Sequence, residues 1–320
     1  MKNNSTSKFS QKYSSEAALL LMVVLWGATF VIIKESLDDI SSMLFIAIRF
    51  MFASLFLAPF LFIQRKKLNK NAVLPGIILG LLTFSAFAAQ TVGLKYTSAT
   101  KSAFLTGTAV VMIPIFQFII EKKKPSRAGI AGTSIVFIGI LFLSSGGDSI
   151  FNFVNELGAN FNAGDWLTLL CAALFALYVI YIDVYSPKYD FWVLVFLQIF
   201  VTSILGFITA ALFYAIDLET LKFEYNSYLA FALFYTAFFT TFLAVIIQTK
   251  FQKNVTPTKA GIIYSFEPIF AAVFAFFLLN EKITNFGLIG SSLIFAGLIL
   301  SEVFDNKKKR IDEGKSESRN

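Results

Sequence analysis

The sequence predicts an all-α integral membrane protein in which ten transmembrane helices form two inverted five-helix repeats. Three observations support this fold class. The 320 residues are 57% hydrophobic and 15% charged, whereas about a quarter of the residues in a soluble domain are charged. The apolar residues form ten segments, each long enough at about 1.5 Å per residue to cross a ~30 Å hydrocarbon core. The two halves of the chain also resemble each other.

We expect a polar tail over 1–15, a first repeat over 16–145, a linker over 146–162, a second repeat over 163–303 and a basic tail over 304–320. The first apolar segment has no small-residue cleavage pattern after it, so we interpret it as a retained span and not as a signal peptide. The last two apolar segments of the chain are joined by a polar turn at 280–284. The expected spans are 16–33, 42–63, 72–94, 98–120, 126–145, 163–183, 191–214, 227–249, 257–279 and 285–301.

The stretch from Thr256 to Glu302 superimposes without a gap on the corresponding part of the first half when it is moved back by 158 residues, and the same offset extends upstream to Gln248. This offset places several identical residues on one another, which indicates an internal repeat of architecture. The matches include Lys259 on Lys101, Gly290 on Gly132, Gly297 on Gly139, and Gln248 on Gln90.

Basic residues predict the orientation in the membrane. Of the 27 Lys and Arg residues, 21 lie on the side of the N-terminal tail, 5 lie on the other side, and Arg49 lies within a span. Because short cytoplasmic loops are enriched in positive charge, this predicts an even number of spans with both termini in the cytoplasm. Five spans per repeat would place the repeats in opposite orientations, with a substrate site near the midplane at their interface.

Composition excludes several kinds of chemistry. The chain has one cysteine, Cys171, and no histidine, so it forms no internal disulfide and lacks the commonest metal ligand and general base. We expect no metal or other cofactor, and no Walker-type phosphate-binding sequence occurs. The net charge of +7 resides in short loops and tails, so we expect no nucleic-acid partner.

Several motifs resemble the drug/metabolite transporter superfamily, specifically proteins with two EamA domains. The resemblance covers about residues 16–303 and implies ten helices in two inverted repeats and transport of small organic metabolites, often outward. Where the family pattern favours a proline near Val110 and an acidic residue near Lys123, this chain has neither. The motifs are Trp26-Gly27-Ala28-Thr29-Phe30, Arg49-Phe50, Gly93-Leu94-Lys95-Tyr96-Thr97-Ser98-Ala99, Ser265-Phe266-Glu267-Pro268 and Leu279-Asn280-Glu281-Lys282.

Two charged side chains fall within expected spans. A carboxylate in hydrocarbon costs about 2.5 to 3.5 kcal/mol on insertion scales, so Glu267 should face a cavity or the protein interior, and Pro268 should loosen the helix beside it. We interpret Glu267 as a substrate or proton site. Arg49 is either a clamp for an anionic group or a structural partner of Glu267 or of helix-end carbonyl groups, and we favour the structural role.

Five other residues complete the candidate site. The amides of Gln90 and Gln248 could contact one ligand from both repeats, or could join helices by hydrogen bonds. Trp26, Tyr178 and Tyr264 could line a cavity, although such residues also anchor proteins at the membrane interface.

We therefore expect a secondary transporter that exports a small organic metabolite, such as an amino acid or related compound, across a bacterial cytoplasmic membrane. Its partners would be the metabolite and the lipid bilayer, and a homodimer is left open. A non-transporting scaffold or sensor is the main alternative. A membrane lipid enzyme is a further alternative, although the spans hold too few ionisable groups to form its active site.

Overall fold

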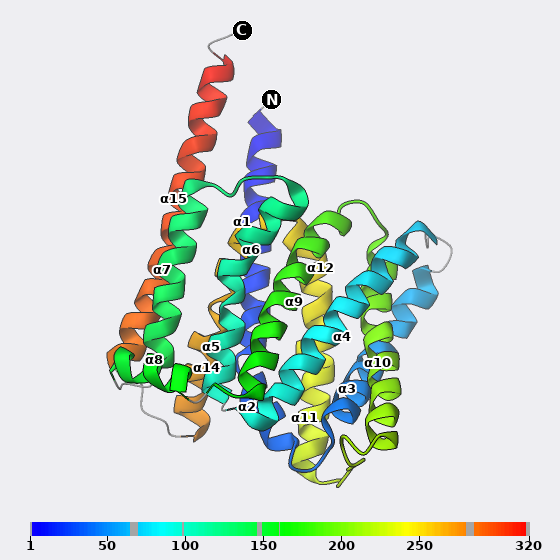
Figure 1. The fold of residues 1–320 in the computed structure, drawn as a ribbon. Coiled ribbons are helices and arrows are strands. Elements are labelled where there is room, and N and C mark those ends of the chain that lie inside the picture. Colours follow the sequence, from blue (N-terminus) through cyan, green and yellow to red (C-terminus); the bar gives the residue numbers. More distant parts are fainter. Residues whose placement is uncertain are drawn as a thin grey trace.

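The computed structural model describes residues 2–64, 70–97, 99–145, 149–159, 161–279 and 285–317. In these ranges the chain is helical, with one isolated β-bridge between Ile40 and Phe223 (Figure 1). The turn expected at 280–284 and the basic residues at 65–69 lie outside these ranges. The α-helices are α1 (Lys2–Trp26), α2 (Thr29–Ser36), α3 (Ser42–Gln64), α4 (Val73–Tyr96), α5 (Ala99–Gly107), α6 (Ala109–Glu121), α7 (Arg127–Ser144), α8 (Ile150–Ala159), α9 (Ala163–Tyr185), α10 (Phe191–Ala215), α11 (Ser227–Ala237), α12 (Ala244–Phe251), α13 (Pro257–Tyr264), α14 (Glu267–Leu279) and α15 (Asn285–Glu317).

Seven helical segments in the described residues are long and apolar enough to cross a membrane, so the protein is a multi-pass integral membrane protein. Two further apolar helical segments, Arg127–Leu143 and Asn285–Ser301, are shorter. The remaining expected span, 257–279, consists of the two short helices α13 and α14. The seven segments are Tyr13–Ser36, Ser42–Ile63, Lys70–Tyr96, Lys101–Glu121, Ala163–Tyr185, Phe191–Ala215 and Ser227–Asn254.

Three expected spans are interrupted. The first breaks at Gly27-Ala28 between α1 and α2, the fourth at Thr108 between α5 and α6, and the ninth at Ser265-Phe266 between α13 and α14. Because Phe266 lies 158 residues after Thr108, the last two breaks are at equivalent positions of the repeat. From the sequence we expected loosening in the ninth span, because of Pro268, and made no prediction of the breaks in the first and fourth spans.

The eighth expected span contains a π-helical turn, Phe238–Leu243, between α11 and α12. A π-helix bonds each N–H to the carbonyl five residues earlier and often occurs at functional sites. Nothing in the sequence pattern predicted it.

Polar side chains begin several helices. Asn162 and Asp165 form a capping box at α9, in which the Asn162 Oδ1 accepts from the Asp165 N–H at 3.1 Å and the Asp165 Oδ2 accepts from the Asn162 N–H at 2.9 Å. Asp190, Asn226 and Ser126 cap α10, α11 and α7 in the same way with one hydrogen bond each. These caps satisfy backbone donors that a helix end would leave unpaired in a membrane protein.

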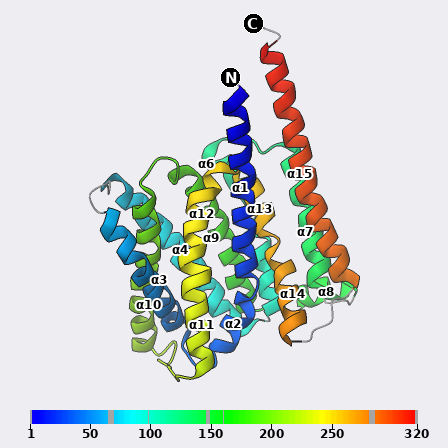
Figure 2. The same cartoon turned by 180° about the vertical axis from the view of Figure 1, so that it is seen from behind.

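Both termini lie at one end of the molecule, and α8, a helix within the expected linker, lies at the opposite end (Figures 1 and 2). The connections between α6 and α7, between α9 and α10, and between α12 and α13 lie at the end of the termini (Figure 1). The connection between α6 and α7 contains Lys122, Lys123 and Lys124. These basic residues therefore lie at the same end of the molecule as the N-terminal tail.

Helices α7 and α15 pack along each other through two pairs of glycines. A Cβ added to Gly132 would lie 2.7 Å from the carbonyl oxygen of Gly297, and one added to Gly290 would lie 2.5 Å from the carbonyl oxygen of Gly139. Small residues of this kind let helix backbones approach closely in a membrane. Because the contact moves from Gly297 back to Gly290 as it moves from Gly132 forward to Gly139, α7 and α15 run antiparallel.

Candidate functional site

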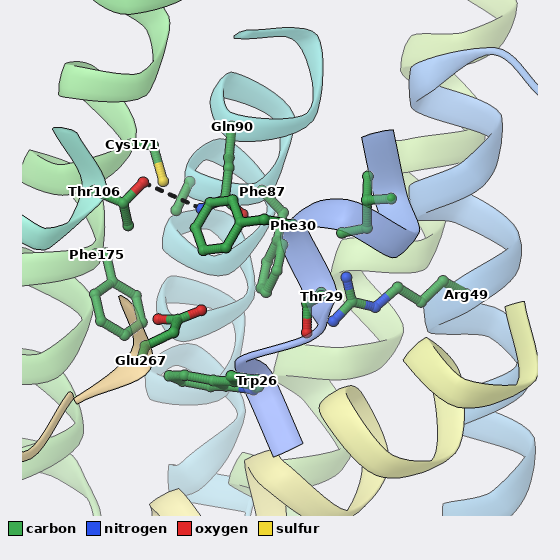
Figure 3. A pocket seen from close by; sticks show the side chains of 12 residues that line it. Trp26, Thr29, Phe30, Arg49, Phe87, Gln90, Thr106, Cys171, Phe175 and Glu267 are labelled. Carbon is green, nitrogen blue, oxygen red and sulfur yellow. Dashed lines mark hydrogen bonds between the residues drawn. The ribbon is translucent and has the colours of Figure 1, made fainter. Parts of the chain in front are cut away.

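A pocket lies among α1, α2, α3, α4, α5, α9 and α14 (Figure 3). It contains about 530 Å³ of space not filled by atoms, part of which is open to solvent. The breaks between α1 and α2 and between α13 and α14 both border it. Its lining residues are Trp26, Thr29, Phe30, Ile33, Arg49, Ala86, Phe87, Gln90, Thr106, Cys171, Phe175 and Glu267.

Glu267 is the first residue of α14 and its partly exposed side chain faces this pocket (Figure 3). Its position follows from the helix break, because α13 ends at Tyr264 and the chain restarts a helix at Glu267. Pro268, the second residue of α14, lacks an N–H at a place where a helix has no internal acceptor for it. The proline therefore begins a new helix and does not merely loosen an existing one.

Arg49 lies on the opposite wall and is almost fully buried, with 1% of its surface exposed. Its Nε donates to the Thr241 Oγ1 at 2.7 Å, and its Nη2 donates to the Thr240 Oγ1 at 3.0 Å and the Thr240 carbonyl at 3.3 Å. The guanidinium carbon lies 4.8 Å from the centroid of the Phe87 ring, a cation–π distance. The π-helical turn thus supplies the acceptors that hold this charge in the core.

The described residues contain no ion pair between Arg49 and Glu267, although both side chains line the same pocket. Arg49 donates instead to the hydroxyl groups of Thr240 and Thr241 and to one carbonyl of the π-helical turn, and its role stays a prediction. The carboxylate and the guanidinium face the pocket from different helices (Figure 3).

Three aromatic rings pack together near Glu267, and two of them, Trp26 and Phe175, line the pocket. The ring centroids of Trp26, Phe175 and Tyr264 lie 5.8 to 5.9 Å from one another, which are favourable contact distances for aromatic pairs. The Trp26 Nε1 donates to the Thr240 carbonyl at 3.2 Å, so the same carbonyl receives a hydrogen bond from Trp26 and from Arg49. Such a rigid aromatic surface suits contact with an ammonium group or an apolar chain.

Two polar groups face the pocket with bonding capacity to spare. The Thr29 Oγ1 is buried and has no hydrogen-bond partner in the described residues, and it lies beside the Arg49 guanidinium in Figure 3. Gln90 donates through Nε2 to the Thr106 Oγ1 at 3.3 Å. A buried hydroxyl without a partner loses about 1 to 3 kcal/mol of hydrogen-bond energy that a bound ligand could restore.

The other predicted residues lie outside this pocket. Gln248 donates to Gln252 at 3.1 Å and to the Tyr264 hydroxyl at 3.3 Å, within a buried network of α12, η4 (Gln252–Asn254) and α13. Tyr178 donates to Gln198 at 2.9 Å. Tyr264 borders a second pocket of about 360 Å³, which shares Glu267 with the first. The arrangement of Gln90 and Gln248 on either side of one ligand is not seen in the described residues.

Sequence reasoning missed several lining residues, namely Thr29, Phe30, Phe87, Thr106, Cys171 and Phe175. A signal for Phe175 was present, because Phe175 is the repeat counterpart of Trp26 in the first span of the second half. No comparable signal marks Phe87 among the 39 phenylalanines.

No group of three or more His, Cys, Asp or Glu side chains in the described part of the chain could hold a metal ion. The pocket instead offers one acid, one base, amide and hydroxyl groups, and aromatic rings. A small molecule with an apolar body and polar or charged ends matches these groups.

A multi-pass helical fold that surrounds such a pocket is typical of membrane proteins that hold small solutes. The model of the EamA-like transporter family matches residues 14–145 and again 162–302. The chain therefore belongs to the EamA-like transporter family and contains its domain twice.

Relatives agree with this assignment. An uncharacterized transporter of Archaeoglobus fulgidus is 33% identical over 286 residues, which cover 89% of this chain and 85% of the relative. The uncharacterized transporter YoaV of Bacillus subtilis is 20% identical over 297 residues, 91% and 97% of the two chains. A solved crystal structure shares the fold with a TM-score of 0.72 at 14% identity, and the match covers 92% of this chain and 98% of that one.

Proposed function

We propose that this protein is a secondary transporter that exports a small zwitterionic metabolite, an amino acid or a related compound, by alternating access. The observation that carries the proposal is the presence of Glu267 and Arg49 in the lining of one pocket without an ion pair between them. An ammonium group would lie between Glu267 and the aromatic rings. A carboxylate would lie at Arg49 and the Thr29 hydroxyl.

The proposed architecture is ten transmembrane helices in two inverted five-helix repeats. Its support is the packing of α7 and α15, which hold equivalent positions in the two matched domains and run antiparallel through equivalent glycines. A helix of 18 residues, the length of α7, extends about 27 Å, close to the thickness of a hydrocarbon core. Inverted repeats of this kind rock about a midplane site.

We place the protein in a bacterial cytoplasmic membrane with both termini in the cytoplasm, on the basis of the distribution of Lys and Arg. Because the chain contains no Walker-type sequence, an ion gradient or the substrate gradient supplies the driving force. Glu267 is the candidate proton carrier. The outward direction rests on the resemblance to metabolite exporters, and a homodimer is a prediction that the mass of the purified protein would test.

The test is transport in proteoliposomes by wild type and Glu267→Gln, with mixed amino acids as substrates and an imposed pH gradient. We expect Glu267→Gln to fold, to bind substrate about tenfold or more weakly, and to lose accumulation driven by the pH gradient, because the ammonium group and the proton both lose their carboxylate. The matched control is Glu224→Gln, since Glu224 is an exposed carboxylate remote from the pocket. A folded Glu267→Gln protein with wild-type rate, affinity and pH dependence would reject the assignment.

A further inference from the structure

Two lysine–carboxylate pairs join the repeats. The Lys101 Nζ lies 2.5 Å from the Asp165 Oδ2, and the Lys259 Nζ lies 2.5 Å from the Glu16 Oε1. All four side chains are largely buried, Asp165 completely and Lys259 to 95%. Each pair joins a residue of one EamA domain to a residue of the other. Neither pair touches the pocket lined by Glu267 and Arg49.

The two pairs are equivalent under the internal repeat. Lys259 lies 158 residues after Lys101, the offset that superimposes the later helices of each half. Asp165 lies 149 residues after Glu16, and the same spacing relates Phe175 to Trp26 in the first helix of each half. In both pairs, therefore, a lysine of the fourth expected span of one repeat contacts a carboxylate of the first expected span of the other.

The pairs lie at opposite ends of the molecule. Helices α5 and α9, which carry Lys101 and Asp165 near their first turns, begin at the end where α8 lies (Figure 1). Helix α13, which carries Lys259 in its first turn, begins at the end of the two termini (Figure 2). A recess of about 790 Å³ lies against the second pair.

Each lysine is also connected to the site by a short helix. Thr106, which lines the first pocket, lies five residues after Lys101 on α5, and Tyr264, which lines the second, lies five residues after Lys259 on α13. Five residues of helix span about 7.5 Å. Both short helices end at the breaks that border the site, so a movement at either pair displaces a wall of the site.

We propose that Lys101–Asp165 and Lys259–Glu16, here called the latch pairs, close the two ends of the pocket in alternation. This inference rests on the proposed transporter function. A buried ion pair is stable while its surroundings stay dry, whereas separated charges need water. When one end opens, water enters there and solvates the separated charges, while the pair at the other end stays dry and closed. Each latch pair therefore couples hydration of its own end to opening of that end.

A purely structural role does not account for both pairs. Asp165 is part of the capping box of α9 and also accepts from the Thr97 Oγ1 at 2.6 Å, so the helix end explains that carboxylate. It does not explain why a lysine is buried against it, or why the equivalent lysine is buried against Glu16, a carboxylate within α1.

Cys171, the single cysteine of the chain, lines the pocket and reports access to it without any added mutation. The experiment measures its rate of reaction with a small charged methanethiosulfonate reagent, applied separately to right-side-out and inside-out membrane vesicles. We expect Lys101→Met to raise the rate about tenfold from the face of α8 only. We expect Lys259→Met to raise it about tenfold from the face of the termini only.

The matched control is Lys222→Met. Lys222 also pairs with a carboxylate, Glu224, at the end where α8 lies (Figure 1), but it lies between α10 and α11, neither of which lines either pocket. We expect its labelling rates to stay within twofold of wild type. The exchanged variant Glu16→Lys/Lys259→Glu, which restores a pair without altering a cap, should also return to within twofold.

Unchanged rates in both methionine variants, or increases from both faces at once, would overturn the proposal. If a methionine variant does not fold, the double variant Glu16→Cys/Lys259→Cys in a Cys171→Ala background is used instead. Crosslinking its two cysteines with a bifunctional maleimide should stop substrate flux. Flux that continues through the bridged protein would also overturn the proposal. The labelling assay needs no substrate, so it tests the latch pairs separately from transport. Face-specific labelling without flux would support the latch pairs and contradict the proposed transporter function. Flux without face-specific labelling would support the transporter function and contradict the latch pairs.

Discussion

The glycine contact between α7 and α15 gives a quantitative prediction for Gly290→Ala. A Cβ at this position would lie 2.5 Å from both the Gly139 carbonyl oxygen and the Leu143 backbone nitrogen, where ordinary contact begins at 3.4 Å. Because both atoms belong to the backbone, no side chain can move aside, and the two helices must separate by roughly 1 Å at their crossing. Overpacking of this kind costs about 1 to 3 kcal/mol, and the higher helix propensity of alanine returns about 0.5 to 1 kcal/mol.

We therefore expect Gly290→Ala to lower the free energy of unfolding by about 1 to 2 kcal/mol, measured by SDS titration of purified protein in detergent. Gly107→Ala on α5 is the matched control, because its Cβ would lie 3.2 Å from the Cδ1 atom of Ile140, the far end of a side chain that can shift. That variant should stay within about 0.5 kcal/mol of wild type. A Gly290→Ala protein as stable as Gly107→Ala would refute the close approach of α7 and α15.

Three further predictions concern topology, Arg49 and acid stability. In a background where the native cysteine is alanine, Asp217→Cys should react with an impermeant thiol reagent in intact cells and Lys123→Cys should not, because short cytoplasmic loops are generally enriched in Lys and Arg; labelling of Lys123→Cys from outside would contradict this. Arg49→Gln should lower the free energy of unfolding by about 1.5 to 3 kcal/mol in the SDS assay, since its charge-assisted hydrogen bonds to the π-helical turn are lost; an unchanged midpoint would show that those bonds contribute nothing. Burial raises the pKa of Glu219, but hydrogen bonds and charge from Lys95 and a backbone hydrogen bond outweigh this and hold its pKa below the ordinary 4.5. Its contribution to stability is therefore complete above about pH 4.5 and lost as the pH falls through the lowered pKa, so Glu219→Gln should flatten the stability curve in that acid range, and an unaltered curve would contradict the pairing.

Much of the fold could be predicted because membrane helices follow from hydrophobic length. The starts of α3, α9, α10, α11 and α13 match the expected residues, since an apolar run begins directly after a polar cap such as Asn162 or Asp190. The helix breaks could not be predicted in the same way. Thr108 has a glycine before it but no proline, and its break becomes apparent only from its equivalence to Phe266 in the other repeat. Local sequence does not determine where packing from the other half interrupts a helix.

The candidate site was predicted unevenly. Glu267, Arg49, Gln90 and Trp26 line the pocket because a charged, amide or indole group in a span has few stable positions other than the protein interior. Gln248 and Tyr178 are also in the protein interior but bond to Gln252 and Gln198. Hydrophobic patterning does not distinguish a polar residue that faces a cavity from one that faces another polar residue. Only the three-dimensional packing separates the two groups.

The π-helical turn at Phe238–Leu243 has a consequence for how this helix tolerates insertion and deletion. Each residue advances an α-helix by about 100°, and a π turn accommodates one residue more than an α turn in the same rise. The two halves of Ser227–Asn254 are therefore out of phase by about 100° relative to an uninterrupted helix. Deleting one residue in the turn would restore regular α-helical bonding. It would also rotate every side chain that follows the turn by about 100° relative to those that precede it. The Thr240 carbonyl, which receives both Trp26 and Arg49, would then return to the helix ladder. A single-residue gap in this segment of a related sequence consequently marks a different set of residues facing Trp26 and Arg49, even where the flanking residues are identical.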